Sequence, residues 1–209
     1  MSSGDETLIG LFPLDLVLLP GEVIPLHIFE ERYKTLIDEL LDGGEFGIVL
    51  SEDDAVRECG CTAHVVELVE RLEDGRMNVL VQGKRRFRLL ELREPDDPET
   101  DYLSGLVEYY SDADPDASEE IRIEVLEAFR RMLVLMDVET PREPVGEGLL
   151  SFRIASAVDF GAPLKQELLE SLSETQRLET LRAVMTALLP RLELRKERED
   201  AIRGNGKGY

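Results

Sequence analysis

The sequence has few of the residues on which many metal sites and secreted scaffolds depend. It contains two cysteines, two histidines and no tryptophan among 209 residues. Cys59 and Cys61 are separated by one residue, whereas a secreted disulfide scaffold needs several cysteines spaced along the chain. No run of about 18 apolar residues occurs, which argues against a transmembrane helix. The first residues lack the basic start and apolar core of a secretory signal, so we expect a cytoplasmic protein.

Basic residues are also scarce. Lysine and arginine number 24 and aspartate and glutamate 45, which gives a formal net charge of −21 at pH 7. Nucleic acids and anionic membrane surfaces both attract concentrated basic surfaces, so we expect neither as a partner. The excess is uneven: residues 1–110 hold 10 basic and 25 acidic groups, net −15, and residues 111–209 hold 14 and 20, net −6.

The pattern of apolar residues changes near residue 111. Before it, short β-rich runs are separated by glycine, proline and acidic turns; after it, apolar residues recur at helical spacing. We therefore predict an α+β protein. A bent β-sheet or pseudo-barrel with one helix is expected over residues 1–111, an antiparallel helical bundle over 112–203, and a disordered tail over 204–209.

The first region is predicted to contain strands at residues 7–14, 17–19, 46–51, 62–72, 77–92 and 102–110. Apolar residues from Phe29 to Leu41 line one face at i, i+4, i+7 and i+8 spacing, and Gly43 and Gly44 follow them. This pattern predicts a helix between the strands. Asp74 and Gly75 are typical of a tight hairpin between two of the strands.

The second region is predicted to contain helices at residues 121–136, 149–160 and 163–169 and a last helix that begins after Ser173. Ser118 or Asp116 is available to cap the first of them. The last helix carries an apolar stripe from Leu178 to Leu192. Pro190 lies within this stripe and predicts a kink or break, because proline lacks a backbone donor and crowds the carbonyl four residues earlier.

Motifs of catalysis and metal binding are absent from the sequence. It contains no Walker loop, no G-x-S-x-G, no H-E-x-x-H and no zinc pattern with four ligands. We therefore predict no catalytic residue, metal or cofactor. Cys59, Cys61 and His64 form one cluster, but His64 would point to the opposite face of a strand and a ligand would be missing. Ordinary strand cysteines are favoured over a metal site.

Three other features have two interpretations each. For His27, between Leu26 and Ile28, a hydrogen-bonded structural role is favoured over that of a general base. For the basic run 84–88, ion pairs with the surplus carboxylates are favoured over contact with an anion or an acidic peptide. For Arg32, anchoring of the predicted helix to a loop carboxylate or carbonyl is favoured over contact with a ligand.

Residues 11–33, LFPLDLVLLPGEVIPLHIFEERY, resemble the N-terminal substrate-binding domain of the ATP-dependent Lon protease. The resemblance rests on the order of its parts: Phe12 to Leu14, Pro20 and Gly21, Pro25 to His27, and then a helix with Arg32 and Tyr33. Further similar segments are Glu58 to Thr62, Asp74 and Gly75, Val79 to Arg86, Lys165 to Glu170, and Arg177 with Leu178.

The resemblance covers about residues 8–195 and implies a PUA-like β region followed by a helical bundle. In the full-length protease this module precedes a coiled coil, an ATPase and a Ser-Lys peptidase domain. The sequence contains no Walker loop, and it is most similar to the stand-alone bacterial proteins of this domain family. The resemblance therefore implies a protein without ATPase or peptidase activity.

We expect a non-enzymatic module that binds an unfolded polypeptide or a protein partner in a groove near the first helix. Leu26, Phe29 and Tyr33 are candidate walls, and Arg32 and Arg86 are candidates to orient a carboxylate or a carbonyl. The full set of candidate peptide-binding residues is Pro20, Gly21, Pro25, Leu26, His27, Phe29, Arg32, Tyr33 and Arg86.

Two other functions stay open. One is a peptidase, for which the sequence offers no recognisable nucleophile. The other is an adaptor that acts through an exposed apolar patch on the 178–192 face of the last helix. If the acidic β region surrounds the groove, basic and apolar segments should bind better than acidic ones. The sequence predicts no oligomeric state.

Overall fold

The computed structural model describes residues 6–53, 55–95, 101–138, 144, 146 and 148–205, with side chains through residue 202. The chain forms two compact units. The barrel unit contains residues 1–111 and 158–170, and the helical unit contains residues 112–157 and 171–209. Residues 158–170, expected in the helical bundle, therefore belong to the barrel unit. No helix in the described ranges is long and apolar enough to cross a membrane.

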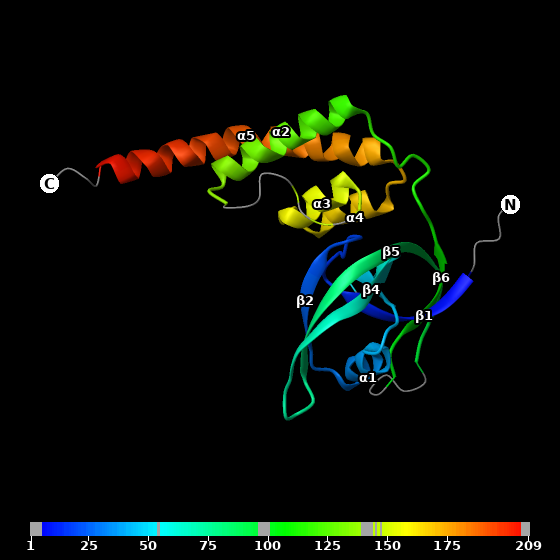
Figure 1. Cartoon of the computed structure of the whole chain (residues 1–209). Helices are drawn as coiled ribbons and strands as arrows, with labels where there is room; N and C mark the ends of the chain where they lie inside the picture. The colour runs from blue at the N-terminus through cyan, green and yellow to red at the C-terminus, as the bar shows by residue number, and fades with distance from the viewer. Residues whose placement is uncertain are drawn as a thin grey trace. The chain divides into compact units, whose positions relative to one another are not determined.

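The barrel unit is built on six strands. They are β1 (Glu6–Leu14), β2 (Val23–Ile28), β3 (Phe46–Glu52), β4 (Ala55–Arg71), β5 (Met77–Arg93) and β6 (Ser104–Tyr109). The strand order is β2-β5-β4-β3-β1-β6, and β5 also pairs with β6. This pairing closes β5, β4, β3, β1 and β6 into a ring (Figure 1). Only β1 and β3 run parallel among these pairs.

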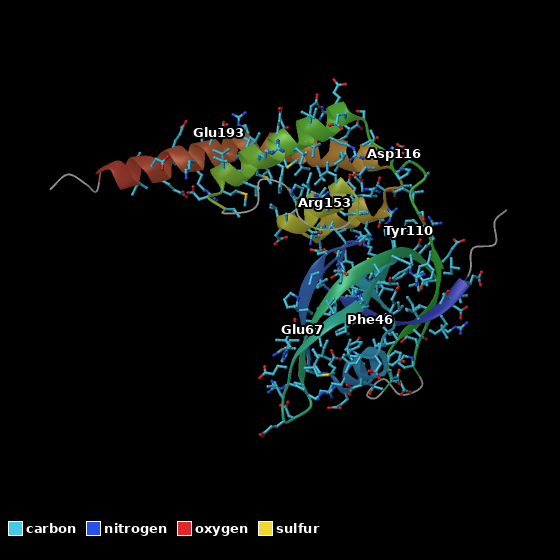
Figure 2. The ribbon with its side chains drawn as sticks, in the orientation of Figure 1. Phe46, Glu67, Tyr110, Asp116, Arg153 and Glu193 are labelled. Atoms are coloured by element: carbon cyan, nitrogen blue, oxygen red, sulfur yellow. The ribbon has the colours of Figure 1, made fainter. Side chains whose placement is uncertain are left out.

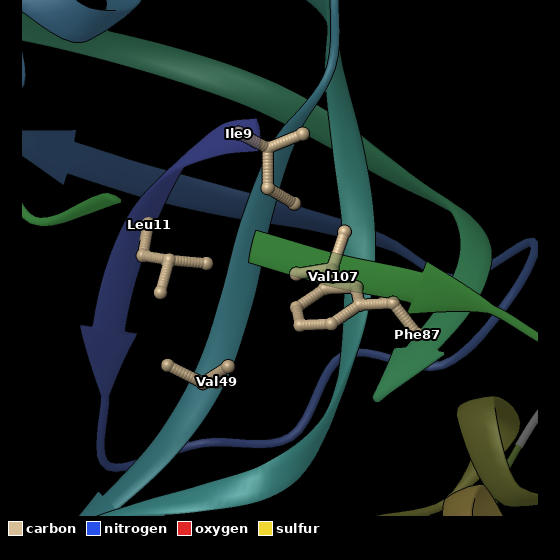
Figure 3. Close-up of a cluster of buried hydrophobic side chains, with 5 residues drawn as sticks. All are labelled: Ile9, Leu11, Val49, Phe87 and Val107. Carbon is tan, nitrogen blue, oxygen red and sulfur yellow. The ribbon is translucent and has the colours of Figure 1, made fainter. Parts of the chain in front are cut away.

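The long strand β5 makes the closure possible. Its first half, Met77 to Gln82, pairs with β2, and its second half, Phe87 to Arg93, pairs with β6. Phe87 lies in the interior with residues of three other strands, Ile9, Leu11, Val49 and Val107 (Figure 3). Gly60 faces this ring: a Cβ there would lie 2.4 Å from Phe87 Cζ. Glycine at position 60 therefore lets the aromatic ring fill the barrel.

Two helices belong to the barrel unit. Helix α1 (Glu31–Leu40) buries Tyr33, Leu36 and Ile37. Helix α4 (Ala162–Glu170) contacts β4.

Polar contacts bind α4 to the barrel. Lys165 forms an ion pair with the buried Glu22, and Gln166 Nε2 donates to the Cys59 carbonyl at 3.1 Å. At the end of the helix, the Leu169 carbonyl accepts from Arg86 Nη1 at 3.0 Å. These contacts explain why α4 forms one unit with strands that precede it by many residues.

The helical unit consists of α2 (Glu119–Leu135), α3 (Leu150–Ala157) and α5 (Glu174–Asn205). Ser118 caps α2 by accepting from the Ile121 N–H at 3.4 Å, and Ser173 accepts from the Gln176 N–H at 3.3 Å. Of the two caps offered for the first helix, Ser118 is therefore the one used, and the predicted start of the last helix after Ser173 is confirmed. Helix α5 packs against α2 and α3.

The predicted antiparallel arrangement is wrong for α2 and α5. Three ion pairs join them in the same order along both helices: Glu124 with Arg182, Arg131 with Glu193, and Asp137 with Lys196. The two helices therefore run parallel. A short loop would force antiparallel neighbours, but the connection between these helices includes α3 and α4 and is long enough to bring the chain back.

Other predictions need correction in detail. Val23–Ile28 is a strand that was not predicted; β2 is an edge strand, where the missing N–H of Pro25 is tolerated. Residues 17–19 are buried but not a strand. Helix α5 continues through Pro190 to Asn205, so of the expected kink or break the break is wrong, as is the expected tail at 204 and 205. Pro190 removes one backbone N–H donor, and this loss does not end a helix of 32 residues. Residues 206–209 lie outside the described ranges.

Candidate binding site at the mouth of the barrel

A groove lies where several strands end at one mouth of the barrel, next to the start of α1. We call it the mouth groove. Its walls are residues 12–14 of β1, Ser51 of β3, Val56 of β4, Leu92 and Glu94 at the end of β5, Leu103 before β6, and His27, Phe29, Glu30, Arg32 and Tyr33. The groove has a cavity volume of about 480 Å³. A cavity of this size accommodates one or two side chains of a ligand.

Aromatic rings form much of the groove. Phe29 follows β2 and is 60% exposed, although its position in the sequence pattern predicted the buried face of the helix. Tyr33, on the first turn of α1, stacks on Phe12 with 3.9 Å between ring centroids. The His27 ring lies 6.1 Å from that of Phe29. The groove therefore combines the exposed ring of Phe29 with the stacked, buried rings of Phe12 and Tyr33.

Charged groups of the groove are largely bound to each other. Arg32 Nη2 lies 2.7 Å from Glu30 Oε2, and its guanidinium lies 4.7 Å from the centre of the Tyr33 ring. Arg32 thus binds a carboxylate directly before α1, which agrees with the anchoring interpretation. His27 Nδ1 lies 2.7 Å from Asn78 Oδ1, and the Asn78 amide donates to Glu70 at 3.0 Å. His27 is therefore a hydrogen-bonded residue, as predicted.

The Tyr33 hydroxyl differs from these paired groups. The residue is only 4% exposed, yet among the described residues its hydroxyl has no hydrogen-bond partner. Burial raises the pKa of Tyr33, an effect that the nearby Arg32 cation opposes. Among the described residues, Gln166 Oε1 is the only buried side-chain polar atom without a hydrogen-bond partner. The Tyr33 hydroxyl, which also has none, therefore keeps access to solvent and is available to a ligand in the groove.

The mouth groove brings together four of the nine candidate residues, namely His27, Phe29, Arg32 and Tyr33. Leu26 is 8% exposed and belongs to the core. Pro25 is exposed on the edge strand β2 and does not line the groove.

The remaining three candidates lie elsewhere in the barrel unit. Pro20 and Gly21 form a turn before β2, where Gly21 has φ 81° and donates to the Gly83 carbonyl at 2.9 Å. Arg86 is 5% exposed; it donates to Leu169 and lies 4.8 Å from the Tyr110 ring centre. A cation at the end of α4 stabilises the carbonyl groups of that helix terminus. None of the three lines the groove.

Several groove residues were not identified from the sequence: Ser51, Val56, Leu92, Glu94 and Leu103. They are far apart along the chain and meet only because their strands end at the same mouth of a closed ring. Ser51, Leu92, Glu94 and Leu103 lie at or near the ends of predicted strands, which was the one indication available. Val56 lies outside every predicted strand, because β4 begins earlier than predicted, at Ala55.

The basic run and the cysteines have structural environments. Arg85 pairs with Glu45 at 3.0 Å and lies 3.8 Å from the Tyr109 ring centre, which agrees with the ion-pair interpretation for this residue of the run. Lys84 and Arg86 instead donate to the Gln82 side chain and the Leu169 carbonyl. Cys61 is fully buried, and burial raises the pKa of its thiol. Within the described ranges, no group of three or more histidine, cysteine, aspartate or glutamate residues is placed to hold a metal ion.

A closed small barrel with a groove of mixed aromatic and polar side chains at its mouth is an architecture typical of binding modules. Comparison with protein families supports this class. Residues 9–187 match the ATP-dependent protease La (LON) substrate-binding domain, and the chain belongs to that family.

Solved structures and curated proteins agree with the family. The Lon N-terminal domain protein from Xanthomonas campestris is 27% identical, with a TM-score of 0.66 over 85% of this chain and 98% of that chain. The N-terminal domain of a Mycobacterium avium complex Lon protease has the same fold, with a TM-score of 0.62 at 20% identity over 86% of this chain and 98% of that chain.

Among curated proteins, the Lon protease of Brucella suis is 28% identical over an alignment of 213 positions, which covers 93% of this chain and 26% of the protease. A Flavobacterium johnsoniae Lon protease is 26% identical over 92% of this chain and 26% of its own length. The chain therefore spans about a quarter of the length of these relatives.

Proposed function

We propose that this chain is a non-enzymatic module that binds unfolded or exposed polypeptide segments, and that the mouth groove is its binding site. The family model is described as a substrate-binding domain, and the matched relatives are proteases, whose substrates are polypeptides. The match to the protease relatives is confined to about a quarter of their length. Recognition of polypeptide is the activity that this part of a protease supplies most directly.

One observation carries the proposal: an exposed Phe29 stands beside a buried Tyr33 whose hydroxyl has no partner among the described residues. An exposed aromatic ring offers apolar contact area, and an unpartnered hydroxyl at the groove surface offers a hydrogen bond to a peptide group. Binding pockets combine these two features, with apolar walls and a few placed polar groups.

The proposal includes the finer expectations from the sequence. The ring of five strands supports a PUA-like description of the barrel unit, and the acidic composition supports a partner other than nucleic acid or an anionic membrane. The module needs no cofactor and acts in the cytoplasm.

Nuclear magnetic resonance tests the proposal. Unfolded casein, titrated into the isotopically labelled protein, should shift the backbone amides of residues 27–33. The F29A variant should weaken binding by about fivefold or more, because a large aromatic contact is lost. V69A is the control, since Val69 is also exposed in the barrel unit but lies outside the groove. Absence of any shift at saturating casein would refute the proposal.

The two other functions predict different results. A peptidase would cleave labelled casein, with or without ATP, whereas we expect intact casein in both incubations. An adaptor of the helical unit would need an exposed 178–192 face on α5. Leu178, Leu181 and Met185 of that stripe are buried, however, and of its members only Leu188, at 36%, is exposed.

A further inference from the structure

The mouth groove contains one carboxylate that no cation of the described chain neutralises. Its acidic wall residues are Glu30 and Glu94. Glu30 is bound by Arg32 at 2.7 Å. Glu94, directly after β5, is exposed and has no hydrogen bond or ion pair with any described residue.

Neighbouring basic residues do not compensate Glu94. The guanidinium of Arg93 is held by Glu91 at 2.9 Å. Six other basic residues of the barrel unit are also in ion pairs with carboxylates: Arg32, Lys34, Arg57, Arg71, Arg76 and Arg85. Residues 1–110 carry a net charge of −15, so the potential around the groove favours a cation from outside.

A second, independent feature points to a ligand in the same groove. Tyr33 is more than nine-tenths buried, lines the groove and has a hydroxyl without a partner among the described residues. This hydroxyl is able to bond a peptide carbonyl or N–H. Phe29 and the stacked pair of Phe12 and Tyr33 supply the apolar surface beside it.

We propose that the mouth groove selects polypeptide segments in which an apolar side chain is flanked by lysine or arginine. The apolar side chain packs against Phe29, the Tyr33 hydroxyl binds the backbone of the segment, and Glu94 pairs with the flanking cation. This selectivity rests on the proposed function, because it requires that the groove bind polypeptide.

Two fluorescein-labelled peptides, GKLFKG-amide and GELFEG-amide, test the selectivity by fluorescence anisotropy. They share the apolar pair and differ only in the charge of its neighbours. At about 50 mM NaCl the lysine peptide should bind at least about fivefold more tightly, and the difference should shrink at about 500 mM NaCl, where the charges are screened. Equal affinities would overturn the selectivity and leave the proposed function standing. Binding of neither peptide would overturn the proposed function itself.

The E94Q variant distinguishes an ion pair between the peptide and Glu94 from a general attraction to the negatively charged chain. It should reduce the preference for the lysine peptide about two- to fivefold, the range of an exposed ion pair. E67Q is the matched control: Glu67, labelled in Figure 2, is an exposed carboxylate on β4 that does not line the groove. Both variants change the net charge equally. An equal loss of preference in the two variants would overturn the role of Glu94.

The Y33F variant tests the hydrogen bond to the backbone of the segment. Both peptides should lose affinity about two- to tenfold, the range of a neutral hydrogen bond. The midpoint of thermal unfolding should stay constant, because the hydroxyl has no partner within the described chain. A lower midpoint with unchanged affinity would show that the hydroxyl is structural and would overturn its role in binding.

Discussion

The helical unit and the barrel unit differ in how completely the polar side chains of their buried residues are paired. In the helical unit, the side chains of Arg177 and Glu174 are 0% exposed and that of Asp112 is 3% exposed. Arg177 pairs with both carboxylates, and Glu174 also accepts from the N–H of Ser151 at 3.0 Å. In the barrel unit, by contrast, the hydroxyl of the largely buried Tyr33 reaches the groove without a partner in the described chain, and Phe29 is exposed beside it.

This difference distinguishes the cluster around Arg177, which is structural, from the mouth groove, which is a candidate binding site. A buried charge without a counter-charge is strongly unfavourable, so the groups around Arg177 serve to join the start of α5, the start of α3 and Asp112. An unsatisfied hydroxyl with an exposed aromatic ring at an open groove contributes little to folding. Both features therefore have a direct explanation in ligand binding, and the predictions below test this distinction.

The largest effect is expected for R177M. The variant leaves Glu174 and Asp112 as buried carboxylates without their cation, which should lower the free energy of unfolding by about 3–5 kcal/mol. Urea denaturation followed by far-ultraviolet circular dichroism measures it. R182M removes the exposed ion pair with Glu124 and should change stability by less than about 1 kcal/mol. Equal effects of the two variants would contradict a structural cluster.

A smaller loss is expected for R86M. Its guanidinium donates to the Leu169 carbonyl and lies over Tyr110, so its removal should destabilise the barrel unit by about 1–3 kcal/mol. R88M is the control on the same strand, where Arg88 is exposed. Casein affinity should be unchanged in R86M, measured at a temperature where the variant is folded. A loss of affinity without a loss of stability would restore Arg86 as a binding residue.

A pH effect is expected at the edge of the barrel unit. Tyr102 donates to Glu39 at 2.7 Å, and this bond raises the pKa of Tyr102 from 10.0 to about 12. The bond favours the protonated hydroxyl, so its contribution to stability is fully present below pH 10.0 and is lost as the pH rises through about 12. The ultraviolet titration of wild type minus that of Y102F should show a tyrosine with this high pKa. A difference curve centred near pH 10.0 would refute the bond.

The smallest effect on stability is expected for F29A. Because Phe29 is 60% exposed, its truncation should change the free energy of unfolding by no more than about 0.5 kcal/mol, although casein binding should weaken. Urea denaturation measures the first quantity and anisotropy the second. A destabilisation as large as that of a buried phenylalanine would show that this ring belongs to the core and would remove the contrast between the units.

Many elements could be predicted because local patterns determine them. The helix from Glu31 to Leu40, the caps Ser118 and Ser173, and the strand β5 follow from apolar spacing and capping residues close in sequence. Strand β2 was missed because Pro25 is tolerated only at an edge, and the position of a strand in its sheet is not a local property.

The candidate site was predictable only in part. His27, Phe29, Arg32 and Tyr33 are close in sequence, and the resemblance to the Lon substrate-binding domain pointed to their segment. Arg86 was misplaced as a groove candidate because the carbonyl that it binds lies 83 residues further along the chain. Because the two residues are so far apart in the sequence, the sequence alone does not show that the Arg86 guanidinium already has a hydrogen-bond partner.

The sequence by itself determined the acidic charge, the change from strands to helices near residue 111, and the family. These properties depend on composition and on residues that are close together in the sequence, so they can be recognised without the folded structure. Only the tertiary structure decided that β5 closes the ring with β6, that α4 joins the barrel unit, and that α2 and α5 run parallel. It also decided that Glu94 and Tyr33 line the same groove. The physical reason is that long-range pairing, burial and counter-charges are properties of the packed chain, which no single segment encodes.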